Sequence, residues 1–476
     1  MVKLSNLLRV AVSAIVVCGM GLCLARAQGA DEPKKPTSRS KIGYMRQDIH
    51  SFKIPPYRGA RYDDMVPDTL DIAERAELAI HGLTSLTDPD LDYELYFMKV
   101  FYRNPPAMIH SFADTYILGR YLEALPLLRI ATGSNLNDRV DRVWMESTLK
   151  SIGPDGLYYI STRGRPWTQG GMMEAWGPAV CWENGSITPS KGQSISEYTS
   201  AVMLGHTLAA IVIYYLRDRN PMWDETCRLM IDRITKMVVD KGDYCYLPLA
   251  LFVPNAKVPP DAEMPAGMWA EESGGGRLIQ SLAQYYKATG YEPARILAGK
   301  LAKFMRFHGK YYDDQGRFVD PGPDNRIAVG GHFHAHTIGL SSMLEYALAV
   351  DDRELMEFVK RSYEWAKTSA SGSSSLVGWF PEAVSPAHPV SELCCGADMI
   401  ALALKLTEAG VGDYWDDADR WVRNALAEGQ LTRTDWIYRA AEILEKRPMA
   451  YDETSDHVAE RALGAFSAYI TGSDYG

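Results

Sequence analysis

The chain has 476 residues, of which 46% are hydrophobic, 11% aromatic and 23% charged. A chain of this length and composition can bury a large core, which excludes intrinsic disorder as its main state. Its 50 basic and 60 acidic residues give a net charge of −10, and no run of residues concentrates positive charge. Nucleic-acid binding needs such a concentration, so we expect no nucleic-acid partner.

The N-terminus has the pattern of a secretory signal peptide. Two basic residues precede the apolar run Val10–Leu24, and the small-residue sequence Ala-Arg-Ala ends at Ala27. The run is short for a bilayer about 30 Å thick, and no stop-transfer sequence follows, which argues against a membrane anchor. Removal of residues 1–27 leaves 47 basic against 60 acidic residues, a net charge of −13. We therefore expect a secreted or periplasmic protein without membrane contact.

Apolar residues then recur at spacings of three and four along most of the chain, which is typical of amphipathic helices. Thirteen segments show this pattern: Thr69–Leu86, Ile109–Thr132, Arg139–Ile152, Glu197–Arg217, Trp223–Val239, Arg277–Thr289, Pro293–His308, His332–Val350, Glu354–Ser369, Glu392–Ala409, Tyr414–Leu431, Thr434–Glu445 and Asp456–Ile470. Almost no alternating strand pattern accompanies them. The sequence therefore predicts an all-α chain.

The predicted helices come in pairs, with short breaks inside a pair and longer connections between pairs. Successive pairs that begin near Arg277, His332 and Glu392 are 55 and 60 residues apart. Helical hairpins of this kind must stack into an open solenoid or close into a ring. The hairpin lengths vary and no short solenoid consensus is visible, so we expect an (α/α)6 toroid over residues 47–476, preceded by a mobile tail over residues 28–46.

Two long connections, 153–196 and 241–276, are rich in tryptophan and carboxylate. Such loops suit sugars, because indole stacks on the C–H faces of a sugar and carboxylates accept bonds from its hydroxyls. The alternative is that the aromatic side chains only pin the loops to the body. Four residues are predicted here to bind substrate: Trp176, Trp182, Trp269 and Glu271.

The densest group of metal-ligand residue types lies between Gly330 and Cys395. Glu392 stands two residues before Cys394, at the predicted start of a helix whose N-terminus favours anions and lowers thiol pKa values. Thiolate with carboxylate is a workable zinc set. The alternative is that Glu392 caps the helix and that the two adjacent cysteines are small core residues.

The remaining cysteines and histidines carry weaker signals. After removal of residues 1–27 five cysteines remain, an odd number that argues against a disulfide framework. A zinc site made of His332, His334 and His336 is less favoured than a hydrogen-bonding role, because only the first and third share a helical face. His206 lies within an apolar helix and is expected to be structural.

In these motifs the sequence resembles glycoside hydrolase family 127, the β-L-arabinofuranosidases. The order and approximate spacing match across roughly 100 residues in four places: Gly331-His332, Pro381-Glu382-Ala383, Glu392-Leu393-Cys394-Cys395, and Tyr414-Trp415-Asp416 with Val422-Arg423-Asn424-Ala425-Leu426. The resemblance implies an (α/α)6 barrel, a zinc–thiolate site and retaining hydrolysis of arabinose-bearing plant or algal glycans.

Carried over by position, the resemblance implies a role for each matching residue. Glu382 matches the acid/base carboxylate, Glu392 and Cys394 match two zinc ligands, and His332 matches a histidine of the sugar pocket. The family's nucleophile belongs to a second cysteine pair further downstream, and no cysteine follows Cys395 here. Cys395 is therefore the candidate nucleophile or additional ligand, although one ion bound by two adjacent helical residues needs irregular backbone.

Two further interpretations stay open, and each belongs to a different functional class. If the chain is truncated or decayed, it is a non-catalytic carbohydrate-binding toroid. If no metal takes part, it is a hydrolase or lyase that uses carboxylates such as Glu271, Glu272 or Glu382. The sequence leaves the sugar and the oligomeric state open.

Overall fold

The computed structural model describes residues 42–55, 70–168, 180–188, 195–248, 250–263, 275–319, 331–384 and 390–467, without the side chains of 112–118. All of them belong to the compact unit Ser38–Gly476. The predicted signal peptide and most of the predicted tail lie outside the described residues, as do Trp176, Trp269, Glu271 and Glu272. Within the described ranges, no helix is both long enough and apolar enough to cross a membrane.

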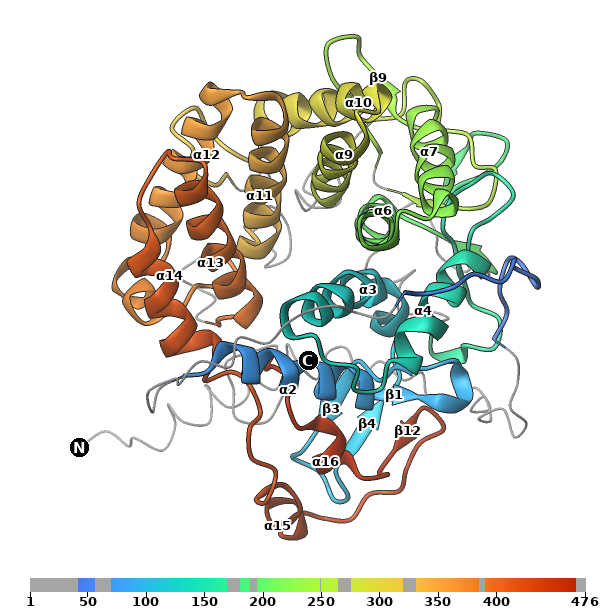
Figure 1. Cartoon of the computed structure of the whole chain (residues 1–476), viewed down its shortest axis with the longest axis vertical. Helices are drawn as coiled ribbons and strands as arrows, with labels where there is room; N and C mark the ends of the chain where they lie inside the picture. The colour runs from blue at the N-terminus through green and yellow to red at the C-terminus, as the bar shows by residue number, and fades with distance from the viewer. Residues whose placement is uncertain are drawn as a thin grey trace. The chain divides into compact units, whose positions relative to one another are not determined.

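Six helices follow one another around a common axis and form the inner layer of this unit (Figure 1). Each packs on the next in the series α2 (Ile72–Ser85), α3 (Phe112–Thr132), α6 (Ala201–Asp218), α9 (Gly276–Thr289), α11 (Phe333–Val350) and α13 (Leu393–Glu408). Each inner helix is largely buried because other helices pack against it on more than one side. In α6, for example, every residue from Ala201 to Tyr214 is buried. The chain after α13 closes the ring, because the Gln430 side-chain amide donates to the Arg75 carbonyl of α2 at 2.9 Å.

Among the described residues, five further helices form the outer layer, each packed against the inner helix that precedes it: α4 (Arg139–Lys150), α7 (Pro221–Thr235), α10 (Glu292–Lys303), α12 (Arg353–Trp365) and α14 (Trp415–Trp421). They are amphipathic, because only one face meets the inner layer. In α12 the buried apolar residues are Met356, Phe358, Val359 and Tyr363. This arrangement confirms the predicted (α/α)6 toroid.

Several helix boundaries differ from the predicted ones. Three outer helices continue into π-helical turns: η3 (Phe304–His308) after α10, η4 (Ala366–Ala370) after α12 and η6 (Val422–Leu426) after α14. The last two helices are shorter than predicted, α15 covering Ile437–Glu442 and α16 covering Val458–Ala462. The predicted helix Asp456–Ile470 is confirmed only over Val458–Ala462, because the chain turns at Gly464, whose φ is +92°, and Phe466 pairs with Gln430.

The long connections contain short paired segments that the sequence did not predict. The strands are β1 (Thr87–Asp88), β2 (Glu94–Leu95), β3 (Met98–Val100), β4 (Ala107–Ile109), β5 (Ile160–Ser161), β6 (Val180–Cys181), β7 (Ile187–Thr188), β8 (Glu197–Tyr198), β9 (Val239–Asp240), β10 (Cys245–Tyr246), β11 (Leu251–Phe252) and β12 (Glu453–Thr454). Two or three residues are too few for a visible alternation. The sheet β12-β4-β3 lies with α16 below α2 in Figure 1. A buried apolar cluster that includes Leu86, Met108 and Val458 joins these elements.

Candidate active site

Three backbone segments meet where α11 and α13 begin. The Phe333 N–H donates to the Glu382 carbonyl at 2.7 Å, and the Val384 N–H donates to the Gly331 carbonyl at 2.7 Å. On the other side the Glu382 N–H donates to the Val390 carbonyl at 2.8 Å. The segment around Glu382 is therefore held like a short middle strand between the residues that precede the two inner helices.

This pairing brings three ionisable side chains together. His332, Glu382 and Glu392 each offer one nitrogen or oxygen atom, and these atoms lie within 4.8 Å of one another. His332 Nε2 is 3.4 Å from Glu392 Oε2. The residues come from points up to 60 positions apart in the chain, so the fold gathers three residues that the sequence predicted for the site.

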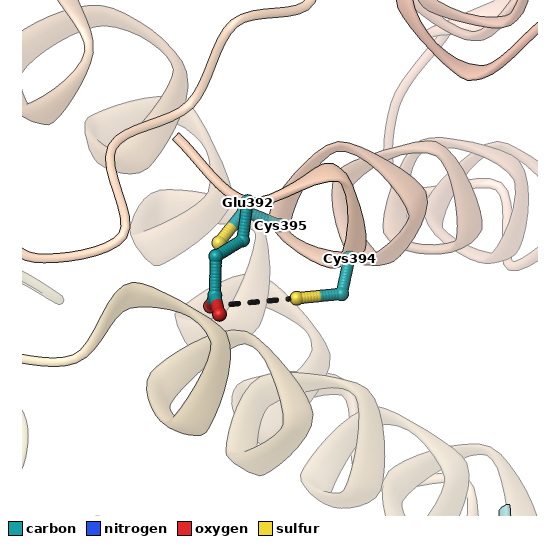
Figure 2. Close-up of side chains that lie close together, drawn as sticks. All are labelled: Glu392, Cys394 and Cys395. Atoms are coloured by element: carbon teal, nitrogen blue, oxygen red, sulfur yellow. Dashed lines mark hydrogen bonds between the residues drawn. The ribbon is translucent and has the colours of Figure 1, made fainter. Parts of the chain in front are cut away.

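The two thiols join the same group through Glu392. This residue has extended backbone, with φ −104° and ψ 139°, and α13 begins at the next residue. Its carboxylate accepts a hydrogen bond from the Cys394 thiol at 3.6 Å, and Figure 2 shows the Cys394 side chain directed at it. The donor atoms of Glu392, Cys394 and Cys395 also lie within 4.8 Å of one another. Cys395 is fully buried, whereas Cys394 is partly exposed.

The pKa values of Glu382 and Glu392 shift in opposite directions. Burial, together with the charge of Glu392, raises the pKa of Glu382 to about 7. Burial alone would also raise the pKa of Glu392, but the hydrogen bond from His332 and the charges of His332 and His334 lower it. One carboxyl group is thus prepared to carry a proton near neutral pH beside another that stays ionised, which is how enzymes divide acid and anion roles.

The prediction of a lowered thiol pKa at the helix start is wrong for the protein alone. The hydrogen bond with Cys395 and burial raise the pKa of Cys394 well above its usual value. These two effects are larger than the lowering of the thiol pKa that the helix N-terminus would produce. A reactive thiolate here needs further stabilisation, and a bound cation would supply it.

The donors present fit a zinc ion. Ligands at about 2.0–2.3 Å from zinc lie less than about 4.6 Å apart, so donor atoms within 4.8 Å need only small side-chain adjustments. Glu392, Cys394 and Cys395 offer one oxygen and two soft sulfurs. Three protein ligands with an open fourth position are typical of catalytic zinc. The extended backbone of Glu392 separates its carboxylate from the helix, whereas Cys394 and Cys395 both lie in the first turn of α13, so the irregular backbone expected between two adjacent ligands is not found there.

The aromatic residues of the first long connection divide into two groups. Trp167 is buried, stacks on His110 with ring centroids 4.5 Å apart and donates to Glu94 at 3.1 Å, so it pins its loop to the body. Tyr158 is likewise buried. Trp182 follows β6, and its partly buried side chain packs on the main core. Its predicted sugar contact remains a prediction, as do those of Trp176, Trp269 and Glu271.

The structure adds two residues beside the site that the sequence did not single out, Asp398 and Arg120. His334 Nδ1 is 2.7 Å from Asp398 Oδ2, and His334 Nε2 is 3.3 Å from Arg120 Nη1. Asp398 stands four residues after Cys394 and so lies on the same face of α13, a spacing that could have indicated it. Arg120 carries no such signal, since it comes from α3, far away in the sequence.

Comparisons with known proteins agree on the fold. No protein-family model matches the sequence, and no curated protein matches it. A sugar epimerase from a ruminal bacterium is 12% identical with a TM-score of 0.50, and the match covers 83% of this chain and 98% of that one. This likeness shows the fold alone.

Two glycoside hydrolase structures are similar at lower scores. A family 76 α-mannanase from Bacteroides thetaiotaomicron is 10% identical with a TM-score of 0.48, covering 83% of this chain and 94% of that one. A family 127 β-arabinofuranosidase is 14% identical with a TM-score of 0.44, covering 76% of this chain. The chain spans 49% of the length of that family 127 structure.

Proposed function

We propose that this chain is a glycoside hydrolase in which Glu382 is the general acid and base. The observation that carries the proposal is the contrast between two neighbouring carboxyl groups, Glu382 with a pKa of about 7 and Glu392 with a lowered one. Hydrolysis of a glycosidic bond needs a proton donor for the leaving oxygen and an anionic group beside it. A resting proton on Glu382 near pH 7 meets the first need.

The proposed reaction proceeds in two displacements with net retention. The Cys394 thiolate forms a bond to the anomeric carbon while the glycosidic C–O bond breaks, and Glu382 gives its proton to the departing oxygen. Water then attacks the same carbon, Glu382 takes a proton from it, and the C–S bond breaks to restore the thiolate. We assign the nucleophile to Cys394 rather than to Cys395, because the latter is fully buried.

Glu392, Cys394 and Cys395 are the residues that would hold zinc in this proposal, and zinc would keep the thiols deprotonated at neutral pH. His332 fixes the orientation of Glu392 through the 3.4 Å contact. The same geometry also supports a metal-free candidate, because retaining enzymes place two carboxyl groups about 5–5.5 Å apart and those of Glu382 and Glu392 approach within 4.8 Å. Glu392 would then be the nucleophile.

The proposed substrate is a glycan that bears arabinose, from a plant or alga, acted on outside the cytoplasm. The sequence resemblance to β-L-arabinofuranosidases and the predicted signal peptide support this choice. The test is hydrolysis of a panel of aryl glycosides and arabinose-bearing polysaccharides by the purified chain. Release of L-arabinose with retention is the expected result. No release from any member of the panel would leave the non-catalytic toroid as the better account.

A further inference from the structure

Arg120 on α3 contacts histidines of two other inner helices. Its Nε donates to His206 Nε2 on α6 at 3.2 Å, and its Nη1 lies 3.3 Å from His334 Nε2 on α11. A guanidinium group has only donors, so the His206 Nε2 that faces it accepts the hydrogen bond. One side chain thus joins three of the inner helices.

A fourth inner helix joins through Asp398 on α13. The opposite nitrogen of His334, Nδ1, lies 2.7 Å from Asp398 Oδ2, and the Thr337 hydroxyl donates to the same oxygen at 2.5 Å. An ionised carboxylate only accepts, so Nδ1 of His334 donates to Asp398. Asp398 therefore holds one side of the His334 ring while Arg120 lies against the other.

The backbone is shaped for this meeting of α3 and α6. A Cβ added at Gly119 would lie 2.5 Å from His206 Cβ, a distance that real Cβ atoms do not reach. Only glycine permits the two helices to approach so closely at this point. The close approach sets Arg120, the next residue, beside His206.

The group formed by Arg120, His206, His334 and Asp398 lies next to the candidate active site. The ring of His334 is 5.9 Å from the ring of His332, with the two planes nearly perpendicular at 88°. His334 lies in the first turn of α11, and His332 is the residue immediately before that helix. A shift of His334 would therefore move His332, which orients Glu392.

We propose that Arg120 is a positioning residue: by holding His206 and His334 in one orientation, it fixes the start of α11 and with it the His332–Glu392 contact. It acts on the site through the two histidines. The expected consequence for turnover rests on the proposed function, whereas the expected consequence for the histidines does not. Loss of orientation by an ångström can cost about 100-fold in rate.

The test compares Arg120→Lys with Arg129→Lys in the full-length protein labelled with 15N-histidine. Lysine keeps the charge but cannot bridge two acceptors with a planar fork. Arg129 is the matched control, because it lies on the same helix, is buried, and pairs with Asp141 at 2.8 Å rather than with a histidine. Side-chain nitrogen spectra, assigned with His206→Gln and His334→Gln, report which ring nitrogen carries the proton.

Wild-type protein is expected to show an unprotonated, hydrogen-bonded Nε2 atom at His206, which accepts from Arg120. Arg120→Lys should shift the Nε2 signals of both histidines, whereas Arg129→Lys should leave them in place. Gly119→Ala, which forces α3 away from α6 without altering the guanidinium, should shift at least the His206 signal. Histidine spectra unchanged in Arg120→Lys would overturn the proposal, whatever the activity of the wild type.

Activity supplies the second readout. In Arg120→Lys we expect kcat to fall about 10- to 100-fold with a smaller change in KM, because orientation rather than binding is lost. Arg129→Lys should lose thermal stability and keep the kcat of its folded fraction. A kcat in Arg120→Lys equal to that of the wild type would overturn the positioning role. A wild type without hydrolase activity would instead contradict the proposed function, and the histidine spectra would still decide this inference.

Discussion

Replacing Glu382 by glutamine is expected to lower kcat on a glycoside with a poor leaving group by about 1,000-fold or more. General acid catalysis contributes about 100- to 10,000-fold, and glutamine cannot give up a proton. On an activated aryl glycoside the loss of the first step should be much smaller, because that leaving group departs without protonation. Rates of the wild type and the variant on the two substrate classes, measured at pH 6, check this expectation.

Glu345→Gln is the matched control for this substitution. Glu345 is a buried glutamate in the C-terminal half of α11 that pairs with Lys287 and Lys405. Its loss should cost stability and leave the leaving-group dependence unchanged. Equal rates of wild type and Glu382→Gln on the poor leaving group would remove Glu382 from the acid role.

Replacing Cys394 by serine is expected to remove both bound zinc and turnover. Altering a group that merely supports a metal ligand costs about 10- to 100-fold in affinity or activity, so loss of a sulfur ligand should cost at least about 100-fold in zinc affinity. The proposed nucleophile is lost in the same step. Metal analysis of the purified proteins and kcat measured with added zinc check the two effects separately.

Cys245→Ser is the control, because Cys245 is a fully buried cysteine on β10. It should keep zinc and turnover in its folded fraction. Activity that survives both Cys394→Ser and chelation would contradict the thiolate mechanism. That outcome would favour the metal-free candidate, in which Glu392 is the nucleophile beside Glu382.

Much of the helical layer could be predicted from the sequence, because helix patterns depend on local spacing. The predicted helix Arg139–Ile152 extends only two residues beyond the observed end of α4 at Lys150. The prediction succeeds because one face of α4 is buried and the other faces solvent, which gives the sequence a clear helical period. The short strands were missed because two or three residues carry no period. The last helix was overestimated because the turn at Gly464 depends on pairing with a distant segment.

The candidate site was partly readable because its members lie close to the starts of two helices. His332, Glu382 and Glu392 occur within one stretch of 61 residues with motif-like neighbours. The direction in which each carboxyl pKa shifts could not be predicted from the sequence, because the burial of Glu382 and its closeness to Glu392 exist only in the fold. Arg120 was missed for the same reason, as its partners His206 and His334 are 86 and 214 residues away.

The ionisation of Glu382 tests the central proposal most directly. Its carboxyl carbon can be followed by NMR in protein labelled with 13C-glutamate and assigned against Glu382→Gln. We expect a pKa of about 7, which falls in Glu392→Gln because a neighbouring negative charge is removed. The protonated acid, and with it kcat/KM, should then decline as the pH rises through that value. An ordinary carboxyl pKa that does not respond to Glu392→Gln would contradict the assignment of Glu382 as the acid.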